Sequence, residues 1–255
     1  MSVLWETVSP PTAAGGTGGS GTRVITEVLA SAGVFMGSRL NRAGDALDMA
    51  DFDWRWGKPY LEAELAGVEP PLVPMQGELP SSLRDHLEGF DGSAGPWGWK
   101  HPHAYLLLPW LDTVIPHLRF VHLVRDGRRV ARSRNQKQQL HYSAVVFGRQ
   151  AEGWDADVRA IRFWSWANAR AADYGEQHMD GRYLRLRLED ICADPRASCS
   201  ALIAFAHDGH APPERVVARA AELVREPPPL PPDSAEHAQQ VEHAGLEGLR
   251  RFGYL

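Results

Sequence analysis

The chain has 255 residues, of which 44% are hydrophobic and 23% are charged, and its net charge is -5. These proportions are typical of a soluble globular protein and exclude the disordered, fibrous and membrane-spanning classes. The acidic balance, with an isoelectric point near 6.1, gives no general attraction to nucleic acid, so we expect no nucleic-acid partner.

The apolar stretches and the N-terminal residues predict no membrane association. The longest apolar stretch, Ala104 to Leu111, has eight residues and contains Pro109, whereas a bilayer span needs about 20. The N-terminal MSVLWETVSPP lacks the basic and apolar regions of a Sec signal. We therefore expect a cytoplasmic protein with a single α/β domain over residues 1–255. Cys192 and Cys199 match no metal spacing and are expected to be ordinary buried residues.

Glycines dominate the first predicted loop. The segment GGTGGSG, residues 15–21, follows a short strand predicted at Thr12–Ala14. Apolar residues then recur at helical spacing from 24 to 32, and Gly33 stands where a C-terminal cap belongs. This order predicts a strand, a glycine loop and a helix in direct succession.

The region from about 45 to 99 carries no clean periodicity but holds four of the nine tryptophans. Prolines at positions 70, 71, 74 and 80 predict short helices and loops, which suit a lid or a pocket for an acceptor molecule. A satellite core under long loops would use the same aromatic side chains. Both interpretations stay open at this point.

Strands and helices alternate through the rest of the chain. We predict a short helix at 104–111, a strand at 119–124, helices after residue 125 and over 155–177, a strand at 183–188, helices at 194–207 and 213–224, and a proline spacer at 227–232 before a helical tail to residue 255. This alternation predicts a parallel sheet with helices on both faces.

Positive charge is concentrated in one short segment. Six arginines and one acid lie between Arg119 and Arg134, which indicates a binding site for a small anion. Arg125 and Ser133 straddle the turn from the predicted strand into the next helix, at the strand edge where open α/β sheets bind their ligands. A planar guanidinium and a hydroxyl suit one phosphate group. The alternative is a solvated basic helix face.

The glycine loop has the spacing of a phosphate-binding loop without its lysine. Gly16 and Gly21 match the glycines of G-x-x-x-x-G-K-[ST], but Thr22 stands at the lysine position and Arg23 follows. Convergent backbone N–H groups and the start of a helix still favour an anion, and the hydroxyls of Ser20 and Thr22 add donors. The alternative is a plain glycine turn.

Together these motifs resemble the PAPS-dependent sulfotransferases, and most closely bacterial members with a GGTGGSGTR loop. The resemblance covers most of the chain, through WKHPHAYLLLPWL, PHLRFVHLVRDGRRVARSRNQ and YLRLRLEDICADP. It implies a P-loop NTPase-like, three-layer α/β fold with a central parallel sheet flanked by helices. It also implies that the loop holds the 5′-phosphosulfate end of 3′-phosphoadenosine 5′-phosphosulfate (PAPS), while Arg125 and Ser133 hold its 3′-phosphate. The loop residues so implied are Gly18, Gly19, Ser20, Gly21, Thr22 and Arg23.

The chain departs from this family pattern at two positions. Gly19 stands where many sulfotransferases carry Lys or Arg, and Leu188 stands where a tyrosine often precedes E-D and contacts adenine. Lys100 matches a lysine of related enzymes, so we expect it to stabilise charge on the leaving phosphate, with Arg23 as the second choice. Opposite charges ~4 Å apart attract by about 4 kcal/mol at an effective dielectric near 20.

Four residues are candidates for the base that removes the acceptor proton. The resemblance of LNRAGDALD to a segment of the bacterial members makes Asp45 the first choice and Asp48 the second. His101 and His103 are the rivals, because they lie next to Lys100 in the sequence and histidine in general changes its protonation near neutral pH. An H-x-H pair without a third ligand does not predict a zinc site, so no metal is expected.

These observations predict a sulfotransferase that moves a sulfuryl group from PAPS directly to a hydroxyl or amine and releases PAP. The acceptor is expected to be a small molecule, aromatic or apolar in character. One alternative is a P-loop small-molecule kinase that uses Mg-ATP, against which the missing lysine argues. The other is a catalytically inactive nucleotide-binding protein. The sequence predicts neither the acceptor nor the oligomeric state.

Overall fold

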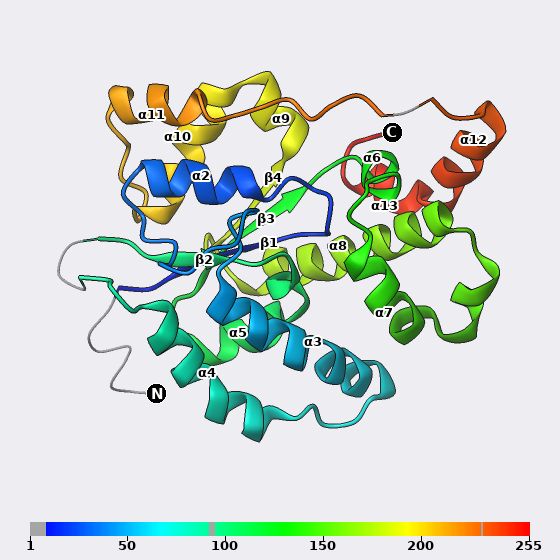
Figure 1. Cartoon of the computed structure of the whole chain (residues 1–255), viewed down its shortest axis with the longest axis horizontal. Helices are drawn as coiled ribbons and strands as arrows, with labels where there is room; N and C mark the ends of the chain where they lie inside the picture. Colours follow the sequence, from blue (N-terminus) through cyan, green and yellow to red (C-terminus); the bar gives the residue numbers. More distant parts are fainter. Residues whose placement is uncertain (1–8, 92–94, 231) are drawn as a thin grey trace.

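A four-stranded parallel sheet forms the centre of the molecule, as Figure 1 shows. The computed structural model describes residues 9–91, 95–230 and 232–255. Two parts of the sequence predictions lie outside the described residues. They are residues 1–8, on which the prediction of no Sec signal partly rests, and Pro231 of the proline spacer. The strands are ordered β2-β1-β3-β4 and comprise β1 (Thr12–Gly15), β2 (Gly98–Lys100), β3 (Arg119–Val124) and β4 (Tyr183–Arg187).

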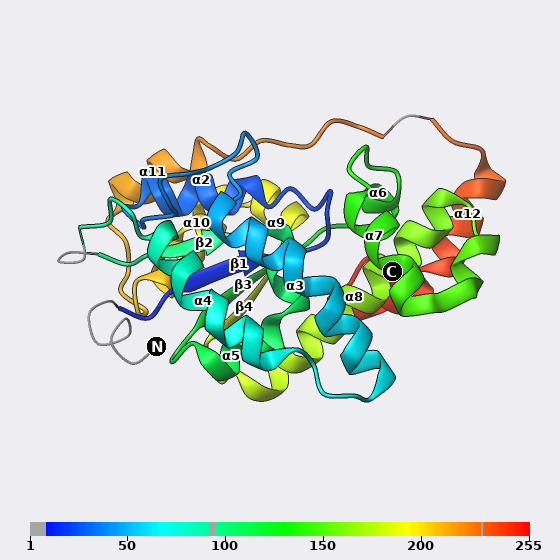
Figure 2. The ribbon, with the colours of Figure 1, turned by 60° about the horizontal axis from the view of Figure 1, so that its bottom comes forward.

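Helices cover both faces of this sheet, which confirms the predicted three-layer α/β class. One face carries Ala14 and Val121 and is covered by α2 (Arg23–Ser31), α9 (Leu188–Ala193), α10 (Pro195–Ala206) and α11 (Glu214–Ala221). The other face carries Ala13 and Phe120 and is covered by α3 (Leu47–Ala66), α4 (Leu72–His86), η1 (Pro102–Leu106), α5 (Leu108–Val114) and part of α8 (Ala156–His178). Figure 2 brings α3 and α4 in front of the sheet.

A third group of helices lies beyond the carboxyl ends of the strands, where the arrow of β3 points (Figure 1). It comprises α6 (Gly127–Ala131), α7 (Lys137–Phe147), η2 (Gly148–Gly153), α12 (Ala235–Ala244) and α13 (Leu246–Arg251). Helices α6, α7, α12 and α13 pack on the long helix α8, and η2 packs on α7. The indole of Trp164 on α8 is fully buried there. None of the described helices is long and apolar enough to cross a membrane.

The strand, loop and helix predicted around the glycines are confirmed. Strand β1 is buried over its whole length and pairs with both β2 and β3. Helix α2 ends at Ser31, and Gly33 adopts a positive φ of 86° just beyond it. The predicted strands at 119–124 and 183–188 and the helix over 155–177 also form, within one or two residues at each end.

The prediction of short helices and loops for 45–99 is wrong. The region forms two long helices, α3 and α4, although Pro59 and Pro80 lie inside them. An interior proline costs about 3 kcal/mol, and burial of apolar side chains offsets this cost. Met75, Leu79 and Leu83 form a fully buried stripe on α4.

Strand β2 escaped prediction because it is only three residues long. It pairs with β1 through a very close backbone approach at Gly98. A Cβ there would lie 1.9 Å from the carbonyl oxygen of Thr12, so only glycine fits. The short helix predicted at 104–111 is instead a 3-10 turn followed by α5, which begins at Leu108.

Candidate functional site

The glycine loop connects β1 to α2 and contains a buried hydroxyl that has no hydrogen-bond partner among the described residues. Gly19 and Gly21 have positive φ values of 93° and 84°, a conformation that favours glycine. Helix α2 has no side-chain cap at its N-terminus, and the hydroxyl oxygen of Ser20 is buried without a partner among the described residues. Unpaired donors at a helix N-terminus favour a negatively charged ligand.

Two glutamines of α7 hold the first half of the loop. The N–H of Gly18 donates to Oε1 of Gln138 at 3.0 Å, and Nε2 of Gln138 lies 3.4 Å from the carbonyl oxygen of Gly16. Nε2 of Gln139 donates to the carbonyl of Gly18 at 3.3 Å. Gly18 therefore shapes the loop, but its N–H is already engaged. Sequence reasoning missed both glutamines because it did not predict α7.

A buried polar chain supports the loop from below. Nδ2 of Asn168 donates to the hydroxyl of Thr17 at 2.9 Å, so Oδ1 of Asn168 accepts from Nε2 of His122, also at 2.9 Å. Nδ1 of His122 then accepts from the hydroxyl of Tyr183 at 2.6 Å. Burial lowers the pKa of His122 to about 4, so this chain holds a neutral imidazole at physiological pH.

The structure brings Arg125 and Ser133 together with the loop. Nη1 of Arg125 donates to the carbonyl oxygen of Gly19 at 2.9 Å. A Cβ at Gly19 would lie 2.8 Å from the hydroxyl oxygen of Ser133, so close packing against Ser133, together with the positive φ, requires glycine here. The Nε of Arg125 is buried and has no partner among the described residues. The two predicted anion-binding motifs are therefore parts of one site.

A cavity of about 290 Å³ opens beside the loop and contains Lys100. The Lys100 side chain is 1% exposed, forms an ion pair with Asp45 and donates to the carbonyl of Ala43 at 2.8 Å. The residues that line this cavity include every loop residue that the sequence predicted to bind the nucleotide except Ser20. The cavity is lined by Gly18, Gly19, Gly21, Thr22, Arg23, Ala43, Asp45, Lys100, Pro102 and Asn135.

Asp45 serves in this structure as the counterion of Lys100. Asn41 orients its carboxylate by donating to Oδ2 at 2.8 Å. Burial raises the pKa of Asp45, but the charge and hydrogen bond of Lys100 outweigh it, so the pKa lies below its usual value. Burial lowers the pKa of Lys100, and Asp45 opposes this. A carboxylate with a lowered pKa is a weak base.

The other three candidates for the base lie in different surroundings. Asp48 forms an ion pair with Arg39. Nδ1 of His103 lies 3.0 Å from the hydroxyl of Tyr142, and burial holds the pKa of His103 well below its usual value.

His101 stands between the cavity-lining residues Lys100 and Pro102, and its Nδ1 lies 2.6 Å from Oδ2 of Asp53. Asp53 is fully buried, and this burial raises its pKa. A carboxylate at Nδ1 fixes the tautomer that leaves Nε2 able to accept a proton. Sequence reasoning missed Asp53, since it lies 48 positions from His101 in a region predicted to be irregular.

Leu188 lines a second cavity of about 290 Å³. Leu188 is the residue at the family's tyrosine position, and its side chain would be 3.0 Å from a Cβ at Gly21. The wall is formed by Arg129, Leu188, Glu189, Cys192, Ala193, Glu226 and Pro227.

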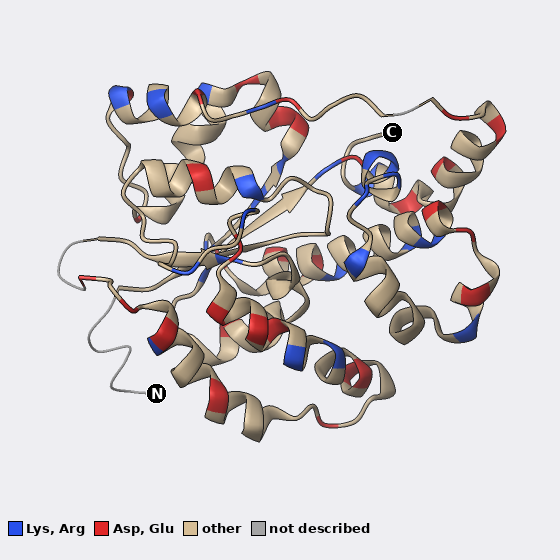
Figure 3. Cartoon of the chain, in the orientation of Figure 1, with Lys and Arg blue, Asp and Glu red and all other residues tan. Residues whose placement is uncertain are grey.

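Most of the other clustered arginines stabilise the fold. Figure 3 shows basic residues at the end of β3 and in α6, beside acidic ones. Arg128 binds Asp126, Glu242 and the carbonyl of Tyr254. The prediction that this cluster binds an anion therefore does not extend to Arg128, whose charge is neutralised by two carboxylates.

The tryptophans of the predicted acceptor region are mainly core residues. Trp97 and Trp99 are fully buried, so the core interpretation is right for them. Trp54 is 39% exposed, and its ring lies 4.1 Å from that of His103. Within residues 9–91, 95–230 and 232–255, no group of three or more His, Cys, Asp or Glu side chains is placed to hold a metal ion.

Comparison with known proteins agrees with this geometry. The sulfotransferase family profile matches residues 16–207, which include the loop, Lys100, Arg125 and Ser133. The chain therefore belongs to the sulfotransferase family.

Two human proteins show local sequence similarity. Carbohydrate sulfotransferase 6 is 35% identical over 108 residues, which cover 39% of this chain and 27% of that protein. Carbohydrate sulfotransferase 5 is 34% identical over 108 residues, with 39% and 26% coverage. The chain thus spans only about a quarter of the length of these curated relatives.

Solved structures show the same fold at low sequence identity. Sulfotransferase STF9 from Mycobacterium avium aligns with a TM-score of 0.56 and 15% identity, over 98% of this chain and 78% of that chain. Sulfotransferase STF1 from Mycobacterium tuberculosis aligns with a TM-score of 0.54 and 13% identity, over 93% and 76%.

Proposed function

We propose that this protein is a PAPS-dependent sulfotransferase that transfers a sulfuryl group to a hydroxyl or amine of a small-molecule acceptor. The observation that carries the proposal is the contact between the two anion-binding motifs, where Arg125 donates to the carbonyl of Gly19. One bisphosphorylated nucleotide can therefore contact both motifs. PAPS supplies the sulfuryl group when bound, and PAP is the product.

The residues around the loop fit such a nucleotide. The N-terminus of α2, which no side chain caps, and the buried hydroxyl of Ser20 suit the phosphosulfate end. Arg125, with its unpartnered Nε, and Ser133 suit the 3′-phosphate. The apolar side chain of Leu188 suits one face of the adenine ring, in the position where many family members have a tyrosine.

Lys100 and His101 are the proposed catalytic residues. Lys100 presents a positive charge in the cavity beside the loop and stabilises the charge that develops on the leaving phosphate. His101, oriented by Asp53, accepts the acceptor's proton at Nε2. Asp45 remains the rival base, but its ion pair with Lys100 and its lowered pKa favour His101.

The acceptor is proposed to approach from the side of α3 and α7. There the indole of Trp54 is 39% exposed beside His103, and Leu140 of α7 is 64% exposed. An exposed aromatic face suits an apolar, aromatic or sugar ring. Because the human relatives are carbohydrate sulfotransferases, sugars belong in any acceptor panel. A cytoplasmic location also remains a proposal.

Calorimetric titration with PAP and with Mg-ATP tests the nucleotide assignment. We expect PAP to bind and Mg-ATP to bind much more weakly, because the loop lacks the lysine of P-loop kinases. Arg125→Ala should weaken PAP binding by about tenfold or more, whereas Arg134→Ala, at an exposed position nearby, should not. Equal binding of Mg-ATP, or unchanged PAP affinity in Arg125→Ala, would contradict the proposal.

Transfer of labelled sulfate from PAPS to a panel of phenols, amines and sugars tests the catalytic part. Transfer that is lost in His101→Asn and retained in Asp45→Asn would support His101 as the base. Tight PAP binding without transfer to any acceptor would favour the inactive nucleotide-binding alternative.

A further inference from the structure

Two histidines lie side by side next to the glycine loop. The centroids of the imidazole rings of His101 and His103 are 4.8 Å apart, and the ring planes meet at 33°. Backbone hydrogen bonds hold this part of the chain in place. The N–H of His101 donates to the carbonyl of Ala14 at 3.1 Å, and the N–H of Gly16 donates to the carbonyl of Pro102 at 3.2 Å. Both imidazoles are therefore fixed relative to the end of β1 and the loop that follows it.

The Nδ1 atoms of the two rings have chemically different partners. Nδ1 of His101 lies 2.6 Å from Oδ2 of Asp53, and a carboxylate can only accept a hydrogen bond. Nδ1 of His103 lies 3.0 Å from the hydroxyl oxygen of Tyr142, which has no other hydrogen-bond partner among the described residues. Tyr142 is fully buried, and a buried donor left without an acceptor costs about 1–3 kcal/mol. Its hydroxyl therefore donates to Nδ1 of His103.

These partners fix opposite tautomers in the two rings. Burial holds the pKa of His103 well below its usual value, so this ring carries a single proton near neutral pH. Because Nδ1 of His103 accepts from Tyr142, that proton is on Nε2, which is a donor. Because Nδ1 of His101 donates to Asp53, Nε2 of His101 is an acceptor. The two neighbouring imidazoles thus present one donor and one acceptor.

Both Nε2 atoms can contact a ligand. Neither of them forms a hydrogen bond with another described residue, and neither is sealed from solvent as Nε2 of His141 is. The small exposed area of His101 and of His103, 3% of each residue, therefore includes Nε2. With ring centroids only 4.8 Å apart, one small molecule can contact both atoms.

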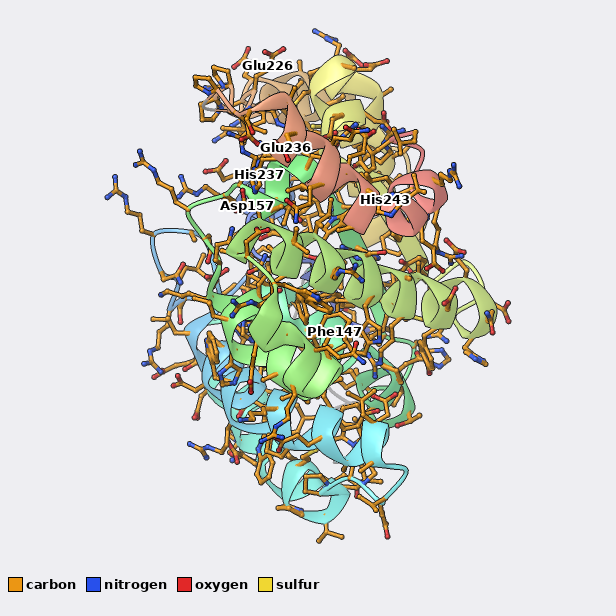
Figure 4. The ribbon with its side chains drawn as sticks, turned by 90° about the vertical axis from the view of Figure 1, so that its right-hand side faces the viewer. Phe147, Asp157, Glu226, Glu236, His237 and His243 are labelled. Carbon is orange, nitrogen blue, oxygen red and sulfur yellow. The ribbon has the colours of Figure 1, made fainter. Side chains whose placement is uncertain are left out.

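The indole of Trp54 extends this pair of rings toward solvent. Its ring centroid lies 4.1 Å from that of His103, and Trp54 is 39% exposed. Trp54 lies on α3 and Tyr142 lies on α7. Helix α7, which ends at Phe147, packs on both α8 and α3 and lies between them (Figure 4). An acceptor ring that packs on Trp54 is therefore next to the donor of His103, and the acceptor atom of His101 is one ring farther in.

We propose that this site selects acceptors that carry a second oxygen on the carbon next to the reacting hydroxyl, as in a catechol or in the vicinal diol of a sugar. The reacting hydroxyl donates to Nε2 of His101, and the neighbouring oxygen accepts from Nε2 of His103. The inference rests on the proposed function and deepens it, because it names the class of acceptor. His103 is then a specificity-determining residue, and Tyr142 is a positioning residue that acts through His103.

Initial rates of sulfate transfer to two matched pairs of acceptors test the inference. Catechol and phenol differ only in the second hydroxyl, as do a vicinal cyclohexanediol and cyclohexanol. We expect the wild type to favour the diol in at least one pair by about tenfold in kcat/KM, the contribution of one hydrogen bond. The pair that shows the preference distinguishes catechols from sugar-like diols.

Tyr142→Phe keeps the ring but removes the hydroxyl that fixes the tautomer of His103. The preference for the diol should fall to about threefold or less. A merely structural role of Tyr142 would lower the rates for both members of a pair and leave their ratio unchanged. Tyr174→Phe is the matched control, because it removes a hydroxyl that lies 3.0 Å from Oδ2 of Asp112 instead. It should keep the preference of the wild type.

NMR of ¹⁵N-labelled histidine side chains in the wild type reads the tautomers without any acceptor. His101 should be protonated at Nδ1 and His103 at Nε2. The same tautomer in both rings, a diol preference below about twofold in both pairs, or an equal preference in Tyr142→Phe and the wild type would overturn the inference. Failure of the wild type to bind PAP would overturn the proposed function instead.

Discussion

The buried ion pair between Lys100 and Asp45 allows a quantitative test of how the cavity is built. Replacing Asp45 with Asn keeps the shape of the side chain but leaves the ammonium of Lys100, which is 1% exposed, without its counterion. Breaking a buried pair from one side costs about 3–5 kcal/mol. Asp45 is itself 14% exposed, so water screens part of the attraction and we expect about 3 kcal/mol.

Urea unfolding of the wild type, Asp45→Asn, Lys100→Met and the double variant measures this coupling. Lys100→Met should cost less than Asp45→Asn, because the remaining carboxylate is partly hydrated. The double variant should be more stable than Asp45→Asn, because it no longer buries an unpaired charge. PAP should stabilise Asp45→Asn more than it stabilises the wild type, since a phosphate would replace the missing carboxylate. A cost for Asp45→Asn below about 1 kcal/mol, or additive single effects, would refute this reasoning.

Three further predictions concern groups around the loop. Asp53→Asn should lower kcat by about 10²-fold, because His101 loses the carboxylate that fixes its tautomer. PAP affinity should stay unchanged. Steady-state kinetics and calorimetry measure the two quantities, and an unchanged kcat would contradict the prediction. Gln138→Leu should weaken PAP binding by about tenfold, since the buried N–H of Gly18 loses its acceptor; equal affinity in calorimetry would count against the loop's dependence on α7. The pKa of His122 is about 4 in the folded protein and 6.5 for an unperturbed histidine. As the pH falls below 6.5, His122 therefore binds a proton in the unfolded chain but not in the folded protein. The free energy of unfolding decreases as a result. Between pH 7 and pH 5 the free energy of unfolding should decrease by about 2 kcal/mol because of His122. Urea unfolding of His122→Gln at both pH values should show a decrease smaller by that amount. An equal decrease in the variant and the wild type would refute the assignment.

The parts of the fold that carry strong local patterns were predictable from the sequence. The buried strand at 119–124 is apolar on both faces, and the helix over 155–177 has a continuous apolar stripe, so local residues suffice to define them. The glycine loop and the pair formed by Arg125 and Ser133 were predictable for a similar reason. Glycine spacing and clustered arginine are visible in short segments.

The parts that depend on contacts distant in sequence were not predictable. Helices α3 and α4 contain interior prolines, and packing against the core, rather than local preference, keeps them helical. The dyad of His101 and Asp53 joins residues 48 positions apart, and Gln138 reaches Gly18 across 120 positions. The ion pair between Asp45 and Lys100 was not predictable either. The two residues are 55 positions apart, and Lys100 is placed by the pairing of β2 with β1.

Position 19 shows how one backbone conformation can restrict later change in a protein. A lysine inserted there to restore the usual family pattern would have to adopt a left-handed backbone and displace the Ser133 side chain. It would therefore damage one half of the nucleotide site while adding charge to the other. A single substitution at position 19 therefore cannot add the usual cation without this damage, and Lys100 supplies the positive charge in the adjoining cavity.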